Sequence, residues 1–458
     1  MKNPVKLSAT QSIAAAFTGL IAVGTILLML PASSSSGKAT NFFDALLTAT
    51  SAFTVTGLAS VDTGTYWSTF GHTVIAFGVQ IGGIGIIAFA SLVAFLVDGK
   101  ISLRNRKSVM AESSAPKHID LRAYLKTVLK MLLFFQSILF IILAVRFFSE
   151  YGYSIDKALS HGAFHSLMTV NHAGFALYAD SMMSFAQDPW IIISMFVFTT
   201  IASLGIPVLI EIRDRLRLQV YSRLGREADY ILPKQWSLNS RIVLWASLVL
   251  VLVGALALTI TEWGNPATLG AMDPAQKVMT GFFQSSMTRT VGFNSIDIAA
   301  MDPGSWIVMN MLMFIGGASG STAGGIKIGT AVILLYIVLT EIRGDAAVNV
   351  GNRRLPRSMQ RQALTIVTVY SAVIIGALLV LRFTTKFSTD QLLFEIISCI
   401  GTVGLSTGIT ASLPEHAKLL LSLVMLFGRL GPIVVATSLA LRKTQRHFEY
   451  PRESPLIG

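Results

Sequence analysis

Four short segments of the chain end in a glycine followed by Leu or Phe, and these segments have the residue types and spacing best suited to binding a cation. They are NFFDALLTATSAFTVTGL from residue 41, DKALSHGAFHSLMTVNHAGF from 156, DPAQKVMTGFFQSSMTRTVGF from 273 and STDQLLFEIISCIGTVGL from 388. They recur at intervals of roughly 115 residues, which indicates a fourfold internal repeat. Glycine permits backbone angles that side chains forbid, so successive carbonyl oxygens can replace the hydration shell of an ion. The glycines are Gly57, Gly174, Gly292 and Gly404.

A short helix is expected before each of these glycines. Each segment opens with a residue able to cap a helix, and Pro274 suits a first helical turn. The capping residues are Asn41, Asp156, Asp273 and Ser388. Each stretch is too short to span a bilayer. If the four helices aimed at one axis, their C-terminal carbonyl groups would place negative partial charge toward a cation. We therefore predict four pore helices that run into an ion-selective filter.

The elements that must hold these segments are apolar. Of the 458 residues, 53% are hydrophobic and 13% are charged, with a mean hydropathy of +0.64, whereas a soluble protein carries about a quarter charged residues. Apolar stretches of bilayer-spanning length predict an all-α polytopic membrane protein with eight transmembrane helices. They lie near 9–30, 73–97, 124–148, 190–212, 240–261, 305–340, 363–383 and 417–441.

The net charge of +12 follows from the placement of the basic residues. Alternate connections hold most of the 36 Lys and Arg residues, namely Lys2 and Lys6 and the segments 98–122, 213–241, 342–361 and 442–458. The positive-inside rule places these connections and both termini in the cytoplasm. The opposite connections hold only Lys38, Lys157, Lys277, Arg289 and Lys386. Because topology explains the basic balance, no nucleic acid partner is needed.

A glycine-rich stretch, GGASGSTAGGIK at 316–327, interrupts the sixth span. Each glycine costs a helix about 1 kcal/mol relative to alanine, so we expect this stretch to unwind. Close packing of helices through small residues is the alternative. Arg429 lies in the last span, where a charge costs at least about 2.5–3.5 kcal/mol, so it should face a pore. Its alternative role is a pairing with a carboxylate that holds the bundle.

Other patterns do not indicate an enzyme. The GIGIIA match at residues 83–88 to a nucleotide-binding loop lies inside a span with no strand before it. His161 and His165 have metal-ligand spacing but no suitable third ligand nearby, so zinc is not expected. No set of nucleophile, base and acid stands out, the acidic residues lie mostly in loops, and Cys399 is expected to be a small core residue. A polytopic membrane enzyme is therefore the weaker alternative from another class.

Six motifs resemble the Trk/Ktr/HKT superfamily of potassium transporters, and most closely its Ktr-type membrane subunit. They are TVTGLASVDTGT, NHAGF, TVGFNS, GGASGSTAGGIK, GTVGLSTG and GRLGP, and the resemblance covers nearly the whole chain. It implies four repeats of a span (M1), a pore helix (P) and a second span (M2), with re-entrant pore loops around a central pore. The implied boundaries are 1–98, 99–218, 219–342 and 343–441, followed by a cytoplasmic tail at 442–458.

The resemblance also implies the residues of the site. The potassium selectivity filter would be Val55, Thr56, Gly57, His172, Ala173, Gly174, Thr290, Val291, Gly292, Thr402, Val403 and Gly404. Family members with Ser at the first filter glycine favour sodium, so Gly57 favours potassium, while His172 and Ala173 depart from the Thr-Val-Gly pattern. The implied gate is Gly316, Gly317, Gly320, Ser321, Thr322, Gly324, Gly325, Lys327 and Arg429. Lys327 has the alternative of extending its ammonium group to the cytoplasmic face.

A subunit of this kind conducts K⁺ into a bacterial cell through the inner membrane, driven by the electrochemical gradient. No covalent cofactor and no metal beyond the transported K⁺ are implied, and Na⁺ is an activator or coupled ion in one alternative, a Na⁺-coupled K⁺ symporter. The implied partners are a second copy of the chain and a cytoplasmic ring of nucleotide-binding KtrA-like regulatory subunits.

Overall fold

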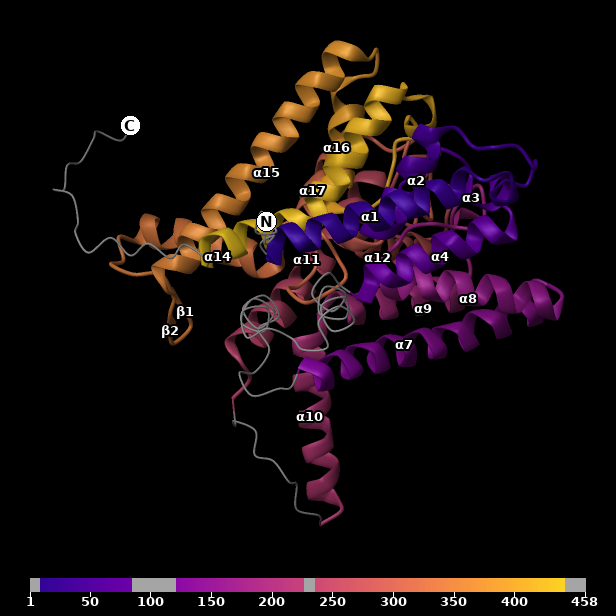
Figure 1. Ribbon diagram of the computed structural model, residues 1–458. Coiled ribbons are helices and arrows are strands. Elements are labelled where there is room, and N and C mark those ends of the chain that lie inside the picture. The colour runs from indigo at the N-terminus through magenta and orange to yellow at the C-terminus, as the bar shows by residue number, and fades with distance from the viewer. Residues whose placement is uncertain (1–8, 85–120, 226–234, 441–458) are drawn as a thin grey trace, which may run out of the picture.

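The computed structural model describes residues 9–84, 121–225 and 235–440, and nearly all of its regular structure is helical (Figure 1). The helices of the first half are α1 (Ala9–Met29), α2 (Phe42–Thr54), α3 (Thr63–Tyr66), α4 (Thr69–Ile84), α7 (Leu121–Ser149), α8 (Ile155–Asn171), α9 (Pro189–Ser203) and α10 (Ile206–Arg223). Those of the second half are α11 (Leu238–Glu262), α12 (Pro274–Thr290), α13 (Pro303–Phe314), α14 (Ile328–Arg343), α15 (Arg357–Thr384), α16 (Thr389–Gly401) and α17 (Glu415–Ala440). Strands β1 (Asn349–Val350) and β2 (Arg353–Arg354) form an antiparallel hairpin between α14 and α15.

Each of the four predicted short helices is present, as α2, α8, α12 and α16. Asn41 caps α2, with its Oδ1 accepting the Phe43 N–H at 2.8 Å, and Ser388 forms a capping box with Gln391 at the start of α16. Asp273 is the N-cap of α12. The predicted cap Asp156 is wrong, because α8 begins one residue before it. Ser154 caps that helix through the Lys157 N–H.

Three of the described helices are long and apolar enough to cross a membrane by themselves, in α7 (from Lys126), α11 and α15. The pair α9 and α10 would be a fourth span if counted together, and α1 and α4 contain shorter apolar helices. The second part of the predicted span 73–97, almost all of the basic connection 98–122, part of the connection 213–241 and the tail 442–458 lie outside the described residues. The eight spans and the repeat boundaries therefore stay predictions.

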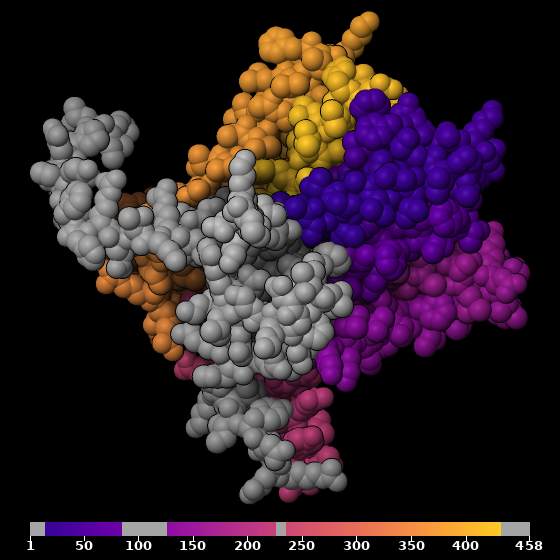
Figure 2. All heavy atoms as spheres, viewed as in Figure 1, coloured from indigo at the N-terminus to yellow at the C-terminus, as the bar shows by residue number. Residues whose placement is uncertain are grey.

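The helices pack in a cyclic order. Each short helix contacts the long helix before it, in the pairs α1 with α2, α7 with α8, α11 with α12 and α15 with α16. The helix that follows each short helix then contacts the next short helix, in the pairs α4 with α8, α9 with α12 and α13 with α16. The last helix, α17, packs on the first short helix, α2, and the N-terminal and C-terminal regions adjoin on one face (Figure 2). The four units thus form a closed ring.

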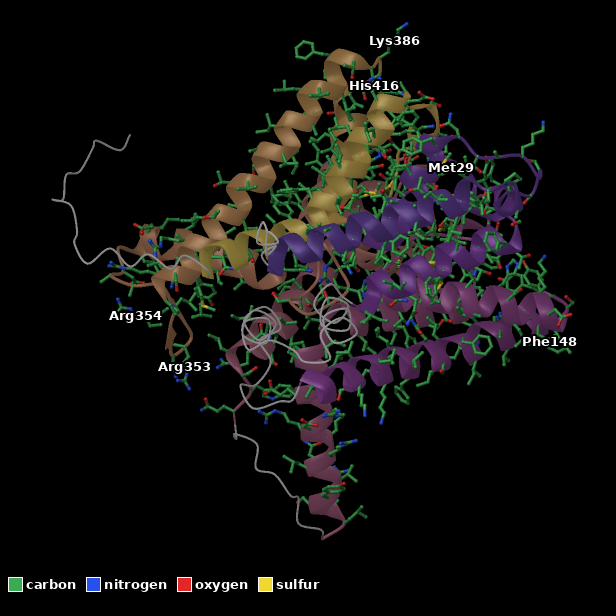
Figure 3. The ribbon with its side chains drawn as sticks, viewed as in Figure 1. Met29, Phe148, Arg353, Arg354, Lys386 and His416 are labelled. Carbon is green, nitrogen blue, oxygen red and sulfur yellow. The ribbon has the colours of Figure 1, made fainter. Side chains whose placement is uncertain are left out.

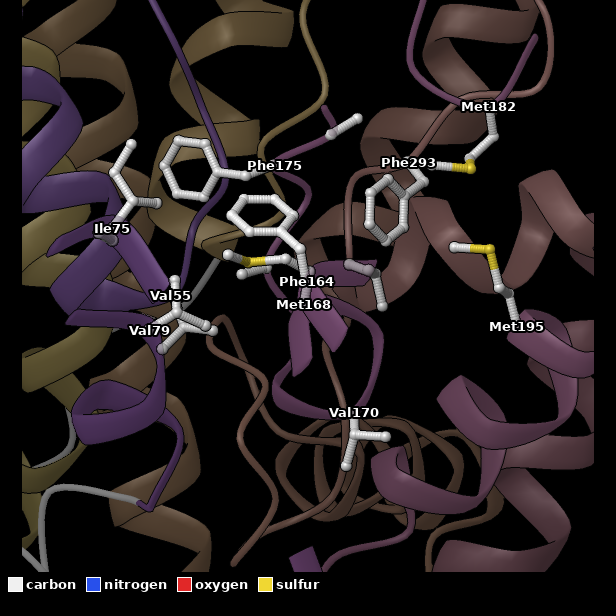
Figure 4. Packing of buried hydrophobic residues seen from close by; sticks show 14 of the residues in the cluster. Val55, Ile75, Val79, Phe164, Met168, Val170, Phe175, Met182, Met195 and Phe293 are labelled. Atoms are coloured by element: carbon white, nitrogen blue, oxygen red, sulfur yellow. The ribbon is translucent and has the colours of Figure 1, made fainter. Parts of the chain in front are cut away.

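Two large apolar clusters hold this ring together. One joins the first two units and also takes in α12 and Phe293 of the third, and side chains from α4, α8, α9 and the loops after α2 and α8 lie close together there (Figure 4). The other joins the third and fourth units and also takes in Leu47 and Leu58 from the first. Helix association inside a bilayer relies on van der Waals packing rather than on a hydrophobic drive, so these close contacts supply much of the cohesion.

Two helices are interrupted where the sequence carries glycine. The axes of α9 and α10 differ by 100°, and Gly205, the second of the two residues between them, has φ +80°. The expected break in the sixth span is present as well, because α13 ends at Phe314 and α14 begins at Ile328. The intervening residues 315–327 form an irregular loop, which we call the inner loop.

Candidate functional site

The four repeat glycines touch one another in a closed ring. A Cβ added to Gly57 would overlap the backbone nitrogen of Gly174. One added to Gly174 would lie 2.7 Å from the Val291 oxygen and 2.9 Å from the Gly292 carbonyl carbon. One on Gly292 would overlap the Val403 oxygen, and one on Gly404 would overlap the Thr56 oxygen. Four segments far apart in the sequence therefore meet around one point, with room for hydrogen atoms but not for side chains.

The backbone before these glycines takes an unusual conformation in three units. Val55, His172 and Thr402, which end α2, α8 and α16, have left-handed angles with φ of +59°, +67° and +48°. Such angles are rare for residues other than glycine, and for β-branched Val and Thr they cost of order 1–3 kcal/mol. Strain of this kind persists only where the surrounding structure imposes it, and it concentrates at functional sites.

A shared hydrogen bond fixes this turn. The N–H after each left-handed residue donates to the carbonyl five residues earlier, from Thr56 to Ser51 at 2.8 Å, from Ala173 to Met168 at 2.8 Å and from Val403 to Ser398 at 2.9 Å. This bond ends the helix and turns the chain back on itself, as in a Schellman motif.

The third unit departs from the other three at this turn. Helix α12 continues through Thr290, and Val291 has a right-handed conformation. The hydrogen bond to the carbonyl five residues earlier is therefore donated by the Gly292 N–H, to the Met287 oxygen at 3.0 Å. Gly292 itself keeps φ +95°, close to Gly57 at +86° and Gly404 at +91°, whereas Gly174 lies outside the left-handed region. The ring is thus unequal at the second unit, where the sequence indicated it, and also at the third.

A cavity of about 630 Å³ opens onto the ring and is lined by all four repeat glycines. We call it the vestibule. Asp62, Asp180 and Asp297 line it, and its described lining includes no Lys or Arg. Carboxylates at the wall of a cleft make the electrostatic potential inside it negative, and this raises the local concentration of cations.

A polar side chain of the preceding short helix anchors the chain that leaves the ring in three units. The Leu177 N–H donates to His165 Nε2 at 3.3 Å, the Ser295 N–H donates to Gln284 Oε1 at 3.3 Å, and the Thr407 N–H donates to Glu395 Oε1 at 3.0 Å. All three acceptors are fully buried, and each donor lies three residues after its repeat glycine. No local signal marks these three residues as anchors, and His165 stands out in the sequence only for its metal-ligand spacing, although each falls on the buried face of a predicted short helix.

The first unit uses a different anchor. Ser60, also three residues after its glycine, donates through its hydroxyl to Asp44 Oδ1 at 2.6 Å. The same oxygen accepts from Lys418 Nζ at 2.7 Å, so this carboxylate has a basic partner from the last helix.

The inner loop lies directly against the fourth segment of the ring. A Cβ on Gly324 would overlap the Thr402 hydroxyl and would lie 3.0 Å from the Gly401 oxygen. The loop is fastened to the bend between α9 and α10, because the Ala318 N–H donates to Ser203 at 3.0 Å and the Ile206 N–H donates to Gly320 at 3.1 Å. The predicted intramembrane loop is therefore adjacent to the glycine ring.

Arg429 connects this loop to two other parts of the chain. Its guanidinium donates to the carbonyl oxygen of Thr322 in the inner loop and, at 2.6 Å, to that of Gly82 in α4. Lys327 donates to the carbonyl oxygen of Ala323. The predicted gate residues are brought together.

Several charged residues expected in solvated connections are buried instead. Arg289 is 2% exposed in the last turn of α12, where its Nη1 donates to the Ser247 carbonyl at 3.4 Å. Lys277 donates to the Trp263 carbonyl at 2.8 Å. Glu262 and Glu395 are also fully buried. Lys277, Arg289 and Glu395 lie on short helices that pack inside the protein, and Glu262 is the last residue of the long helix α11.

The two histidines with metal-ligand spacing both have other partners. His161 Nδ1 lies 2.9 Å from the Tyr178 hydroxyl. His165 Nδ1 faces the His161 carbonyl at 2.8 Å and its Nε2 accepts from Leu177, so its proton resides on Nδ1. Within the residues that the structure describes, no group of three or more His, Cys, Asp or Glu could hold a metal ion.

Comparisons with known proteins give a consistent result. Residues 2–449 match the TrkH family, described as a cation transport protein. The chain is 33% identical over 455 residues to the Ktr system potassium uptake protein B of Bacillus subtilis, covering 99% of this chain and 98% of that protein. It is 32% identical over 469 residues to the potassium/sodium uptake protein NtpJ of Enterococcus hirae, covering 100% and 99% of the two chains.

The fold resembles a solved structure. The crystal structure of the potassium transporter TrkH from Vibrio parahaemolyticus superposes with a TM-score of 0.69 at 20% sequence identity, covering 97% of this chain and 87% of that one. At this identity the likeness concerns the fold alone.

The close approach of the ring segments can be tested by substituting glycines. Gly404 and Gly408 have similar angles, φ +91° and +88°, but a Cβ on Gly404 meets backbone and one on Gly408 meets nothing within 4 Å. We expect Gly408→Ala to lower the free energy of unfolding by about 1–2 kcal/mol, from backbone strain alone. Gly404→Ala should lower the thermal midpoint of the detergent-solubilised protein further, because it adds a clash. Equal midpoints would mean that the segments do not touch at Gly404.

Proposed function

The chain belongs to the TrkH family of cation transport proteins, and on this premise we propose that it is the ion-conducting membrane subunit of a potassium uptake system. The observation that carries the proposal is the closed ring of Gly57, Gly174, Gly292 and Gly404, which opens onto a vestibule lined by carboxylates. The names of the relatives support potassium as the transported ion.

The selectivity filter in this proposal is the ring together with the two residues before each glycine. Irregular backbone at membrane depth must be buried in protein or line a water-filled path, and the ring segments border the vestibule. A dehydrated K⁺ would exchange its water ligands for backbone carbonyl oxygens of the four segments. The left-handed turns at Val55, His172 and Thr402 fix the backbone that carries these carbonyls.

The topology in this proposal is eight spans in four M1-P-M2 repeats, with both termini in the cytoplasm. The vestibule faces outward, because the carboxylates there would gather cations from outside. The hairpin residues Arg353 and Arg354 face inward under the positive-inside rule. In a bacterium the protein would reside in the cell membrane.

The inner loop and Arg429 form the gate in this proposal. The loop lies against the inner side of the ring at Thr402, and Arg429 bonds to its Thr322 carbonyl. A loop rich in glycine can exchange conformations at low cost in energy, and a fixed positive charge near the path adds an electrostatic barrier to cations. Movement of the loop would remove the obstruction and displace Arg429.

The flux is driven by the electrochemical gradient of K⁺ in this proposal. A second candidate is a Na⁺-coupled K⁺ symporter, which is favoured by the potassium/sodium uptake protein among the relatives. Uptake of K⁺ by proteoliposomes with and without a Na⁺ gradient separates the two.

The proposed partners are a second copy of the chain and a cytoplasmic ring of nucleotide-binding KtrA-like subunits. The relative from Bacillus subtilis is named as one protein of a Ktr system, which supports the presence of further subunits. The hairpin between α14 and α15 presents Arg353 and Arg354 on the surface, far from Lys386 and His416 at the opposite end (Figure 3). Because this site is exposed and basic, a soluble partner can bind to it.

The proposed filter is tested by placing a side chain at each glycine. Gly57→Ser, Gly174→Ser, Gly292→Ser and Gly404→Ser should each reduce the preference for K⁺ over Na⁺, because the added Cβ displaces the neighbouring segment. Initial rates of K⁺ and Na⁺ uptake into proteoliposomes measure that preference. Gly376→Ser is the control, since a Cβ there meets nothing within 4 Å. Wild-type preference in all four variants would refute the filter, and no K⁺ uptake by the wild type would refute the function.

The proposed gate is tested by removing its parts. Deletion of residues 317–324 and Arg429→Ala should each raise K⁺ flux without a regulatory partner. Their effects should not add in the double variant, because both act on one constriction. Arg382→Ala, at an exposed arginine of α15, is the control. A folded deletion variant that conducts no faster than the wild type would show that the inner loop is only packing.

The proposed partner surface is tested by charge reversal. Replacing Arg353 and Arg354 by Glu, and separately removing residues 446–458, should weaken co-purification with the nucleotide-binding subunit. Lys386→Glu, at the opposite end of the molecule, should leave it unchanged. Full binding by both altered proteins would place the partner on another surface.

A further inference from the structure

The anchor in the fourth unit is an acidic side chain, unlike its counterparts in the second and third units. The Glu395 side chain is fully buried and accepts hydrogen bonds from Ser406 Oγ at 2.6 Å, the Thr407 N–H at 3.0 Å and Thr410 Oγ1 at 2.9 Å. It also accepts a longer bond from Thr407 Oγ1 at 3.4 Å. Ser406 and Thr410 line the vestibule. A carboxylate is therefore held directly behind the vestibule wall by groups that all can donate to it.

The other units show that the anchor itself needs no charge. His165 and Gln284 occupy the corresponding positions and accept the corresponding backbone N–H, in each case without a negative charge. The Gln284 amide performs this task while its own Nε2 has no partner. An imidazole and an amide are sufficient for this task in the second and third units, so anchoring alone does not require an acidic side chain at Glu395.

No basic side chain in the described part of the chain forms an ion pair with Glu395. Asp44, the anchor of the first unit, pairs with Lys418, but none of the ion pairs includes Glu395. A buried carboxylate without a basic partner attracts any cation that enters the adjoining vestibule, because the protein interior screens the attraction between two charges less than bulk water does.

The following inference rests on the proposed function. We propose that Glu395 is a fixed negative charge that sets the affinity of the vestibule for K⁺. A K⁺ ion in the vestibule or filter is then its counter-ion. Glu395 does not touch the ion in this role. It acts through space, while Ser406, Thr407 and Thr410 hold it in position.

The test compares concentration dependence of K⁺ uptake in proteoliposomes of the full-length protein. Glu395→Gln preserves the shape and the anchor, since its amide can donate to the Thr410 hydroxyl. The half-saturating K⁺ concentration should rise severalfold, because the variant removes a fixed negative charge behind the wall of the vestibule. The maximal rate should change much less. A purely structural role would instead lower the maximal rate or the yield of folded protein.

Moving the charge gives a second, independent measurement. Gln284→Glu should lower the half-saturating concentration, and the double variant Glu395→Gln/Gln284→Glu should return it toward the wild-type value. Glu262→Gln is the matched control, because Glu262 is as buried as Glu395 and forms no ion pair with another described residue. Unlike Glu395, it is not held by residues that line the vestibule: its hydrogen-bond partners are Asn265, Thr268, Asp302 and Ser305.

The outcomes separate this inference from the proposed function. If the wild type takes up K⁺ and the half-saturating concentration is unchanged in both Glu395→Gln and Gln284→Glu, the inference is overturned and the function stands. An equal rise in Glu262→Gln would also overturn it. If the wild type takes up no K⁺ at all, the proposed function fails and the inference fails with it.

Discussion

The structure depends on the contact between four backbone segments that have no side chain where they meet. Irregular backbone is tolerated at membrane depth only inside protein or beside water, and each segment of the ring meets this requirement through its neighbours. The left-handed turns, the anchors from the short helices and the cyclic order of the long helices all serve this contact. Removing any one segment would leave the other three with an exposed backbone edge.

The sequence predicted the helical class, the four short helices and the glycines that meet, because these features repeat and each has a local physical cause. The spacing of Gly57, Gly174, Gly292 and Gly404 was sufficient to place them together. The inner loop was also predictable, since five glycines within ten residues are incompatible with a stable helix.

Other features could not be predicted because they depend on tertiary packing. The one-residue extension of α12 through Thr290 follows from no local signal, since the third segment carries the same Thr-Val-Gly as the fourth, whose helix ends one residue earlier relative to its glycine. The burial of Arg289 and Glu395 was missed because a short helix of mixed polarity resembles a surface helix in sequence. Arg429 was placed near the inner loop by family resemblance, and its bonds to Thr322 and Gly82 join residues remote along the chain.

The closure of the ring by α17 on α2 also has a consequence for biogenesis. Lys418 and Asp44, which bridge these helices, are 374 positions apart. The contact between α2 and α17 can therefore form only after nearly the whole chain has been synthesised. Contacts of such long range form late in folding. A chain released before α17 would insert most of its helices yet leave the ring open at one side. The contact between all four glycine segments is therefore completed only when the last helix has been synthesised.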